Sequence, residues 1–253
     1  ERGLKFKKRN QIYLNTWHGT GPKTCGNAAS GRKDYNFKNV NYVCSDGEYL
    51  KEILVRDLKA NPANVVLCGR PREDSLYHPK IQTVQNLRVK YGISADDFVI
   101  LYAPTWREAK NKSIKSSFDL ILDIEKILRD IPNSKILFRA HSITDCINTD
   151  LIFSKRFISV TEEPEINDLF LISDVLITDY SSAITDFSIL KKPFLCFAPD
   201  YNDYIKEGAL YYDIKEEFPF GVQTSTSEVI SILNDIKSGN NKINDFISFL
   251  NIS

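Results

Sequence analysis

Short apolar runs rich in β-branched and aromatic residues recur along the chain and predict strands. They are nearly continuous rather than alternating in polarity, which is typical of strands buried on both faces of a parallel sheet. Between them, apolar residues return every three or four positions and predict helices. The predicted strands are 40–44, 65–68, 98–102, 135–138, 157–160, 175–178 and 193–197, and the predicted helices are 118–129, 181–190 and 227–236. Alternation of this kind predicts an α/β fold with right-handed crossovers.

The pattern also predicts two units. The chain has 253 residues, which suits one large domain or two ordinary ones. A polar stretch containing Pro79 and Gly92 precedes the strand at 98, so we divide the chain into residues 1–94, an N-terminal unit plus linker, and residues 95–253. The C-terminal unit has enough strands for a complete doubly wound domain. The N-terminal unit has only two or three, and we expect its beginning to be missing from the chain.

Charge is distributed unevenly along the chain. The 33 basic and 33 acidic residues cancel, which excludes a protein that coats nucleic acid through bulk charge. Residues 1–60 nevertheless hold 12 basic and 6 acidic residues, whereas residues 121–253 hold 12 and 21. We therefore expect the first part of the chain to meet an anionic partner.

The sequence lacks the motifs of several common classes of protein. The five cysteines include no C-x-x-C pair, which indicates a reducing compartment rather than a metal site. Without a signal peptide or a run of 18 apolar residues, no membrane span is predicted. D-x-D, P-loop and dinucleotide-binding motifs are also missing, so we predict neither a metal nor a cofactor.

The first candidate site follows the apolar residues 12–14, where a strand gives way to a loop. Here His18 is followed by Gly19, Thr20 and Gly21, and Lys23 comes shortly after. The glycines allow a tight turn that leaves the imidazole accessible, and histidine is the natural base near neutral pH. The alternative is a loop histidine that only hydrogen-bonds to backbone.

Two more candidates follow strands of the C-terminal unit. Thr105 and Arg107 come after the strand at 98–102, and Arg139 and His141 come after the strand at 135–138. Arginine can grip a phosphate with its planar fork, and a histidine can donate a hydrogen bond to a phosphate oxygen. The alternatives are an ion pair for Arg107 and a capping or packing role for His141.

The most informative segment follows the strand at 175–178. Asp179, Tyr180, Ser181 and Ser182 stand in succession before a predicted helix. The first amides of a helix lack internal partners and favour anions, and the serines add hydroxyl donors. Simple capping by Asp179 or Ser181 explains one polar residue but not four in a row. Since parallel sheets bind ligands beyond the carboxyl ends of their strands, these loops predict a site for a phosphorylated ligand.

Taken together, these segments resemble the bacterial CDP-glycerol glycerophosphotransferases, which are the teichoic acid primases and polymerases. The motifs that carry the resemblance lie at 17–20, 69–74, 102–107, 139–141 and 173–182, with Lys23 and residues 186–187 and 192–193 in addition. The resemblance covers most of the chain. It implies a glycosyltransferase B type of fold, with two Rossmann-like domains and the active site in the cleft between them.

The resemblance also implies a reaction. Such an enzyme moves glycerol phosphate, or a related polyol phosphate, from a CDP-activated donor to a hydroxyl of a lipid-linked teichoic-acid-like or capsule polymer, and CMP is released. It would act in the cytoplasm, peripherally on the anionic inner face of the cell membrane, with no nucleic acid as partner.

Residue roles follow from the resemblance as well. His18 is similar to the family's catalytic base, and Gly19, Thr20 and Lys23 lie on the acceptor side. The donor-side residues divide into binders of the pyrophosphate and residues that support them. The binders are Arg107, His141, Ser181 and Ser182, and the supporting residues are Thr105, Arg139 and Asp179.

Other readings remain open at this point. A nucleotide-sugar glycosyltransferase or epimerase of the same fold would use the same helix-start phosphate site. A transferase of the capsule pathway with a different polyol, and a nucleotide-binding module without turnover, fit the residues as well.

Overall fold

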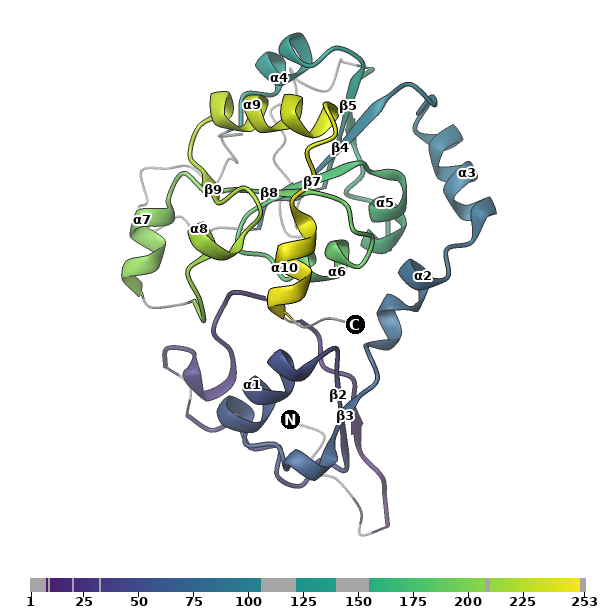
Figure 1. Cartoon of the computed structure of the whole chain (residues 1–253). Coiled ribbons are helices and arrows are strands. Elements are labelled where there is room, and N and C mark those ends of the chain that lie inside the picture. The colour runs from purple at the N-terminus through teal and green to yellow at the C-terminus, as the bar shows by residue number, and fades with distance from the viewer. Residues whose placement is uncertain are drawn as a thin grey trace.

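The computed structural model describes residues 8, 10–19, 21–31, 33–105, 122–139, 155–207 and 210–250. In these ranges the chain forms two separate sheets, one of three strands in the order β1-β2-β3 and one of six strands in the order β6-β5-β4-β7-β8-β9. All neighbouring strands run parallel. Figure 1 shows the smaller sheet below the larger one. The predicted α/β class with parallel sheets is confirmed.

The smaller sheet is covered on one face by a single long helix. Its buried side chains, among them Leu50, Leu54 and Leu58, pack with Phe37 and Val43 into a separate small core. The sequence predicted a strand close to each of the three strands of this sheet, the first ending at residue 14, but not the helix. The elements are β1 (Leu14–Asn15), β2 (Tyr42–Ser45), α1 (Glu48–Leu58) and β3 (Val65–Leu67), with short 3₁₀ turns at Gly26–Ala28 and Pro62–Asn64.

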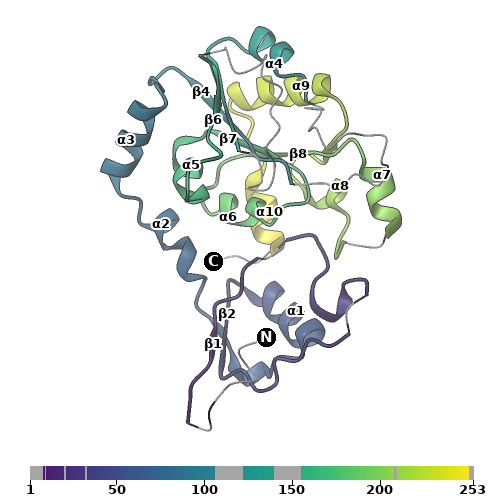
Figure 2. The ribbon, with the colours of Figure 1, turned by 180° about the vertical axis from the view of Figure 1, so that it is seen from behind.

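The segment between the sheets is helical. A 3₁₀ turn (Pro71–Glu73), α2 (Asp74–Tyr77) and α3 (Ile81–Lys90) follow β3. Figure 2 shows them running along the side of the molecule from the smaller sheet to the larger one. The sequence predicted a polar linker here, because α3 buries only Leu87 and shows no clear apolar face. The division of the chain at residue 94 stays a prediction.

The larger sheet has the strand order of a Rossmann fold. β4 stands in the middle, β5 and β6 follow on one side, and β7, β8 and β9 follow on the other. The chain thus reverses its direction of winding between β4 and β7, and such a switch point is where open α/β sheets bind ligands. The strands are β4 (Phe98–Tyr102), β5 (Ser134–Phe138), β6 (Phe157–Ser159), β7 (Val175–Thr178), β8 (Phe194–Phe197) and β9 (Val222–Gln223).

Helices cover both faces of the larger sheet, so its strands are buried on both sides as predicted. One core joins α4 and α9 to the sheet, and the other joins α5, α6 and α10 to the opposite face. The helices are α4 (Ile124–Asp130), α5 (Ile166–Ile172), α6 (Ala183–Ser188), α7 (Tyr201–Tyr204), α8 (Ile214–Glu217), α9 (Thr226–Lys237) and α10 (Ile243–Leu250), with a 3₁₀ turn at Ile205–Glu207.

Of the predicted helix starts, one was correct to within one residue and two were wrong. The helix predicted from residue 227 begins at Thr226, where Ser225 caps it by accepting from the Glu228 amide. The helix predicted from residue 118 begins at Ile124, because Asp123 accepts from the Lys126 amide and caps it there; residues 118–121 lie outside the described residues. α6 begins at Ala183 rather than at 181.

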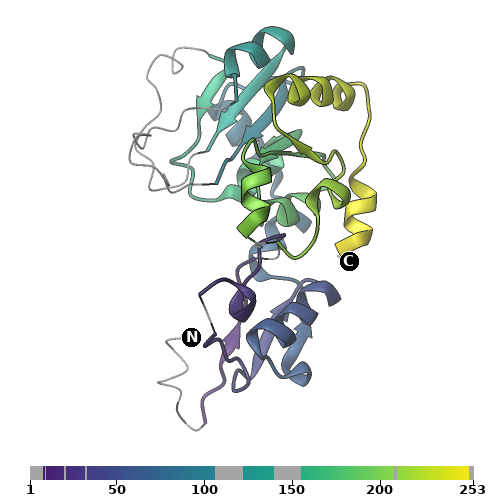
Figure 3. The same ribbon diagram turned by 90° about the vertical axis from the view of Figure 1, so that its left-hand side faces the viewer.

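The smaller sheet and its helix contact the C-terminal half through aromatic side chains and through hydrogen bonds. Helix α10 places Phe249 6.1 Å from the ring of Tyr49 in α1, and Figure 3 shows α10 reaching toward α1. Another contact is made by Tyr211, whose amide donates to the Pro22 carbonyl oxygen at 2.7 Å. Its hydroxyl donates to Asp57 Oδ2 at 2.8 Å and accepts from the Cys25 amide at 3.0 Å.

None of the helices formed by the described residues is long and apolar enough to cross a lipid bilayer.

The Tyr211 contact gives a test of how the two halves are held together. Replacing Tyr211 by Phe removes the hydroxyl but keeps the ring, so Asp57 and the Cys25 amide lose a partner. We expect the free energy of unfolding to fall by about 1–2 kcal/mol, the range for a buried hydrogen bond. Urea denaturation measures it, with Tyr42→Phe as control because the Tyr42 side chain is 49% exposed. Equal losses in the two variants would contradict this role of Tyr211.

Candidate active site

At the switch point, one side chain links the ends of β4 and β7. Asp179, which follows β7, accepts at Oδ2 from both the amide and the hydroxyl of Thr105, which follows β4, at 3.1 and 2.7 Å. One residue earlier, the Thr178 hydroxyl donates to the Ala103 carbonyl oxygen at 2.6 Å. The structure thus brings together two of the residues predicted to support the donor site, and it fixes the ends of the two strands relative to each other.

Ser181 and Ser182 follow at the same edge, and both are half-buried. The hydroxyl of Ser181 accepts from the Ala183 amide at 3.2 Å, so it takes the capping role that was the alternative reading. Ser182 occupies the N-cap position but, within the described part of the chain, makes no capping hydrogen bond with its side chain.

His18 lies on the loop that follows β1 of the smaller sheet and extends toward α6. Trp17 shapes the loop: its backbone has the left-handed φ of 52°, and its indole nitrogen donates to the Gly19 carbonyl oxygen at 2.7 Å. The indole ring lies 4.5 Å from the imidazole of His18 and 5.9 Å from the ring of Phe37. His18 itself is exposed, as the prediction of an accessible base requires.

The loop touches the start of α6 through its glycines. A Cβ atom added to Gly19 would lie 3.0 Å from the Ser182 hydroxyl oxygen, and one added to Gly21 would lie 3.2 Å from Ser182 Cα. Larger residues would push the loop off the helix. The glycines therefore bring the predicted base and the predicted phosphate-binding serine into one site, although they come from different sheets.

The surroundings of His18 favour its neutral form. Although His18 is exposed, the protein atoms beside its imidazole remove part of its hydration and lower its pKa below the ordinary value, and the positive charges of Arg72 and Arg70 lower it further. A lowered pKa means that the imidazole is unprotonated at neutral pH. In that state it can accept a proton, which is what a general base must do.

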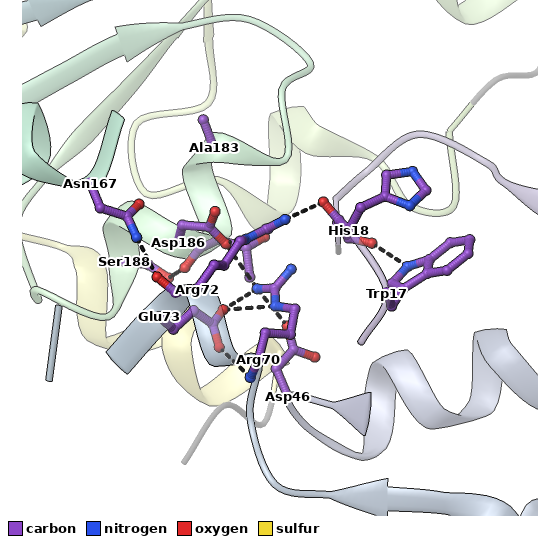
Figure 4. Close-up of polar contacts among 12 residues, drawn as sticks. Trp17, His18, Asp46, Arg70, Arg72, Glu73, Asn167, Ala183, Asp186 and Ser188 are labelled. Atoms are coloured by element: carbon purple, nitrogen blue, oxygen red, sulfur yellow. Dashed lines mark hydrogen bonds and ion pairs between the residues drawn. The ribbon is translucent and has the colours of Figure 1, made fainter. Parts of the chain in front are cut away.

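A network of buried charges lies behind the His18 loop, and Figure 4 shows its members. Arg70, only 2% exposed, extends Nη2 to Asp46 and to Asp186, each at 2.9 Å, and also pairs with Glu73. Arg72 uses one guanidinium nitrogen for Asp186, at 2.9 Å, and the other for the carbonyl oxygen of His18. Burial raises the pKa of Glu73. The network joins the end of the smaller sheet to α6.

The sequence led to no predicted role in the site for the charged residues of this network. Residues 69–74 contributed to the family resemblance, but neither Arg70 nor Arg72 was among the predicted site residues. Their position could have identified them, because both follow the end of β3 and the other candidate residues were also chosen because they follow the ends of strands. A cavity of about 360 Å³ opens there, with Asp46, Gly69 and Tyr77 in its wall.

Lys23 and Arg139 lie at the margins of the site. The exposed Lys23 places its Nζ 5.7 and 5.9 Å from the ring centres of Tyr204 and Tyr180, which are stacked on each other. The guanidinium of Arg139 donates to the Glu163 carbonyl oxygen, and burial lowers its pKa. The contacts found for Arg139 thus lead toward Glu163 and not toward Ser181 or Ser182.

Three predicted site residues lie outside the described residues: Thr20, Arg107 and His141. Their assignments stay predictions.

Comparison with known proteins supports the relationship that the motifs indicated. The chain is 34% identical to a teichoic acid poly(glycerol phosphate) polymerase of Bacillus spizizenii over 92% of its length and 63% of that protein's. It is 30% identical to a teichoic acid poly(ribitol-phosphate) polymerase of the same organism, over 97% and 41% of the two lengths. The chain thus spans less than two thirds of these relatives.

Among solved structures, the wall teichoic acid polymerase TagF matches with a TM-score of 0.84 at 28% identity, over 96% of this chain and 64% of that one. A further TagF structure of equal TM-score comes from a variant soaked with CDPG. The similarity confirms the predicted glycosyltransferase B type of fold. A family model described as CDP-Glycerol:Poly(glycerophosphate) glycerophosphotransferase matches residues 3–250, and the chain belongs to that family.

Proposed function

We propose that the chain carries the active site of a transferase for glycerol phosphate or a related polyol phosphate. The donor is CDP-activated, the acceptor is a hydroxyl of a lipid-linked teichoic-acid-like or capsule polymer, and CMP is the second product. The observation that carries this proposal is the contact of the exposed His18 loop with Ser182 at the switch point of the larger sheet. Membership of the family supports it, and relatives named for glycerol and for ribitol phosphate leave both polyols open.

The donor's diphosphate would lie at Ser181 and Ser182. Their hydroxyls supply hydrogen bonds, while the Thr105–Asp179 contact holds the strand ends beneath them. Arg107 and His141, which come after β4 and β5 in the sequence, would supply positive charge. In phosphoryl transfer, donors fixed in advance around the phosphate are usually the largest catalytic contribution.

His18 would act as the base. The acceptor hydroxyl attacks the β-phosphorus in line and forms a new P–O bond, while the bond from the β-phosphorus to the bridging oxygen breaks. CMP leaves with the electron pair, and the hydroxyl proton passes to the imidazole. The lowered pKa of His18 keeps it ready for this step at neutral pH.

The acceptor would approach from the N-terminal part, whose excess of basic residues suits an anionic polymer and an anionic membrane surface. We therefore place the protein in the cytoplasm, peripherally on the inner face of the cell membrane. Gly19, Thr20 and Lys23 would face this acceptor.

A donor screen tests the proposed function directly. The full-length protein is incubated with lipid-linked acceptor and with CDP-glycerol, CDP-ribitol or a UDP-sugar, and the released nucleotide is identified. We expect CMP from one or both CDP-polyols. Release of UDP alone would replace the proposal with a nucleotide-sugar transferase.

Removal of the base should separate turnover from binding. In His18→Ala we expect the rate of CMP release to fall about 10²–10⁴-fold, the usual contribution of a general base, while calorimetry shows CDP-glycerol affinity close to that of the wild type. His78→Ala is the control, since His78 is exposed in the segment between the sheets. Near-normal turnover in His18→Ala would remove His18 as the base.

The two serines should act on binding instead. A Ser181→Ala, Ser182→Ala double variant loses two hydroxyl donors to a charged group, each worth about 1.5–3 kcal/mol. We expect the Kd for CDP-glycerol to rise at least about a hundredfold. The control is Ser238→Ala with Ser248→Ala, whose hydroxyls donate to carbonyl oxygens of their own helices. Unchanged affinity in the first double variant would place the diphosphate elsewhere.

A further inference from the structure

Arg72 connects the His18 loop to the helix that begins at the phosphate-binding serines. We propose that Arg72 is a positioning residue for His18: its guanidinium holds the loop carrying the base at a fixed place relative to α6. The proposal rests on the proposed function, in which His18 is the base.

The geometry of the contact is specific. Nη1 of Arg72 donates to the carbonyl oxygen of His18, and Nη2 donates to Asp186 Oδ1 at 2.9 Å. The carbonyl belongs to the peptide that joins His18 to Gly19, and Gly19 is the residue that touches Ser182. A single planar group thus fixes the peptide directly after the base.

Both ends of this link are anchored. Asp186 is 5% exposed and is also held by Arg70 Nη2 at 2.9 Å. The backbone of Arg72 is fixed as well, because its carbonyl oxygen accepts from Asn167 Nδ2 at 2.6 Å. The guanidinium therefore bridges two parts that the rest of the structure already holds in place, and it can set the distance between them.

The Arg72 side chain can be changed without opening the core. It is 36% exposed, whereas the Arg70 side chain, which pairs with the same carboxylate, is 1% exposed. When Arg72 is replaced, Asp186 keeps its partner Arg70. The buried charges remain paired, and the fold is expected to persist.

Arg72 also contributes to the electrostatics around the imidazole. The positive charges of Arg72 and Arg70, which follow β3, lower the pKa of His18. The carboxylates of Asp46, Glu73 and Asp186 lie behind these two arginines and are paired with them. Loss of the Arg72 charge should therefore raise the pKa of His18.

The test compares two replacements that separate position from charge. Arg72→Lys keeps the charge but cannot reach two acceptors with one planar fork. Arg72→Gln loses the charge as well. The control is Arg129→Gln, because the Arg129 side chain is 68% exposed and pairs only with its neighbour Asp130 among the described residues. For each variant, kcat and KM for CDP-glycerol are measured across pH with lipid-linked acceptor.

We expect kcat to fall about 10- to 100-fold in both Arg72 variants, since small displacements of a reacting group have effects of this size. The KM for the donor should change little, and Arg129→Gln should match the wild type. The acid limb of kcat/KM should move to higher pH in Arg72→Gln and stay in place in Arg72→Lys. A kcat within twofold of the wild type in Arg72→Lys would overturn the proposal.

A second measurement separates this proposal from the proposed function. The pKa of His18 is read from NMR titration of the three histidines, with signals assigned through His18→Asn and His78→Asn. A rise in Arg72→Gln but not in Arg72→Lys supports the link even if the wild type releases no CMP, which would defeat only the proposed function. An unchanged His18 titration in Arg72→Gln, or the same change in Arg129→Gln, would overturn the placement of Arg72 beside His18.

Discussion

The meeting of the two sheets depends on the burial of one guanidinium group. Arg70 is 2% exposed, and a charge so far from water is tolerated only with partners close by. Its carboxylate partners come from three elements: Asp46 follows β2, Glu73 ends the 3₁₀ turn after β3, and Asp186 lies in α6. Because each of these elements brings a carboxylate to the same guanidinium, the small sheet, the linker and α6 are held together.

Helix α6 is thereby contacted twice by the N-terminal part of the chain. At its start, the glycines of the His18 loop pack on Ser182. About one turn later, Asp186 receives Arg70 and Arg72. Two contacts on one short helix restrict both its distance from the loop and its rotation. The imidazole and the serine proposed to bind phosphate thus have a defined relation, which a single contact would not give.

The features that could be predicted from the sequence are those determined by residues close together in the chain. Strands buried on both faces have continuous apolar runs, so β4 and β7 were found at their observed bounds, and strand ends indicated Thr105 and Asp179 at one edge. α1 was missed although Leu50, Leu54 and Leu58 recur at helical spacing. The start of α6 was placed two residues too early, because Ser181 lies before the helix and its side chain caps it by accepting from the Ala183 amide. The pairs that Asp186 forms with Arg70 and Arg72 span 116 and 114 positions, and no periodicity encodes them.

The arrangement of charges in this network determines the sign of the charge that faces His18. Two guanidinium groups face three carboxylates, yet the carboxylates lie on the buried side and Arg72 is the half-exposed member. The side that faces His18 is therefore positive, while the excess of acidic groups is confined to the interior. A lysine in place of Arg72 would supply the same charge, but only as a point charge without a fixed direction. The planar fork instead keeps the positive group beside the imidazole and binds the loop's own backbone, so electrostatics and position depend on the same side chain.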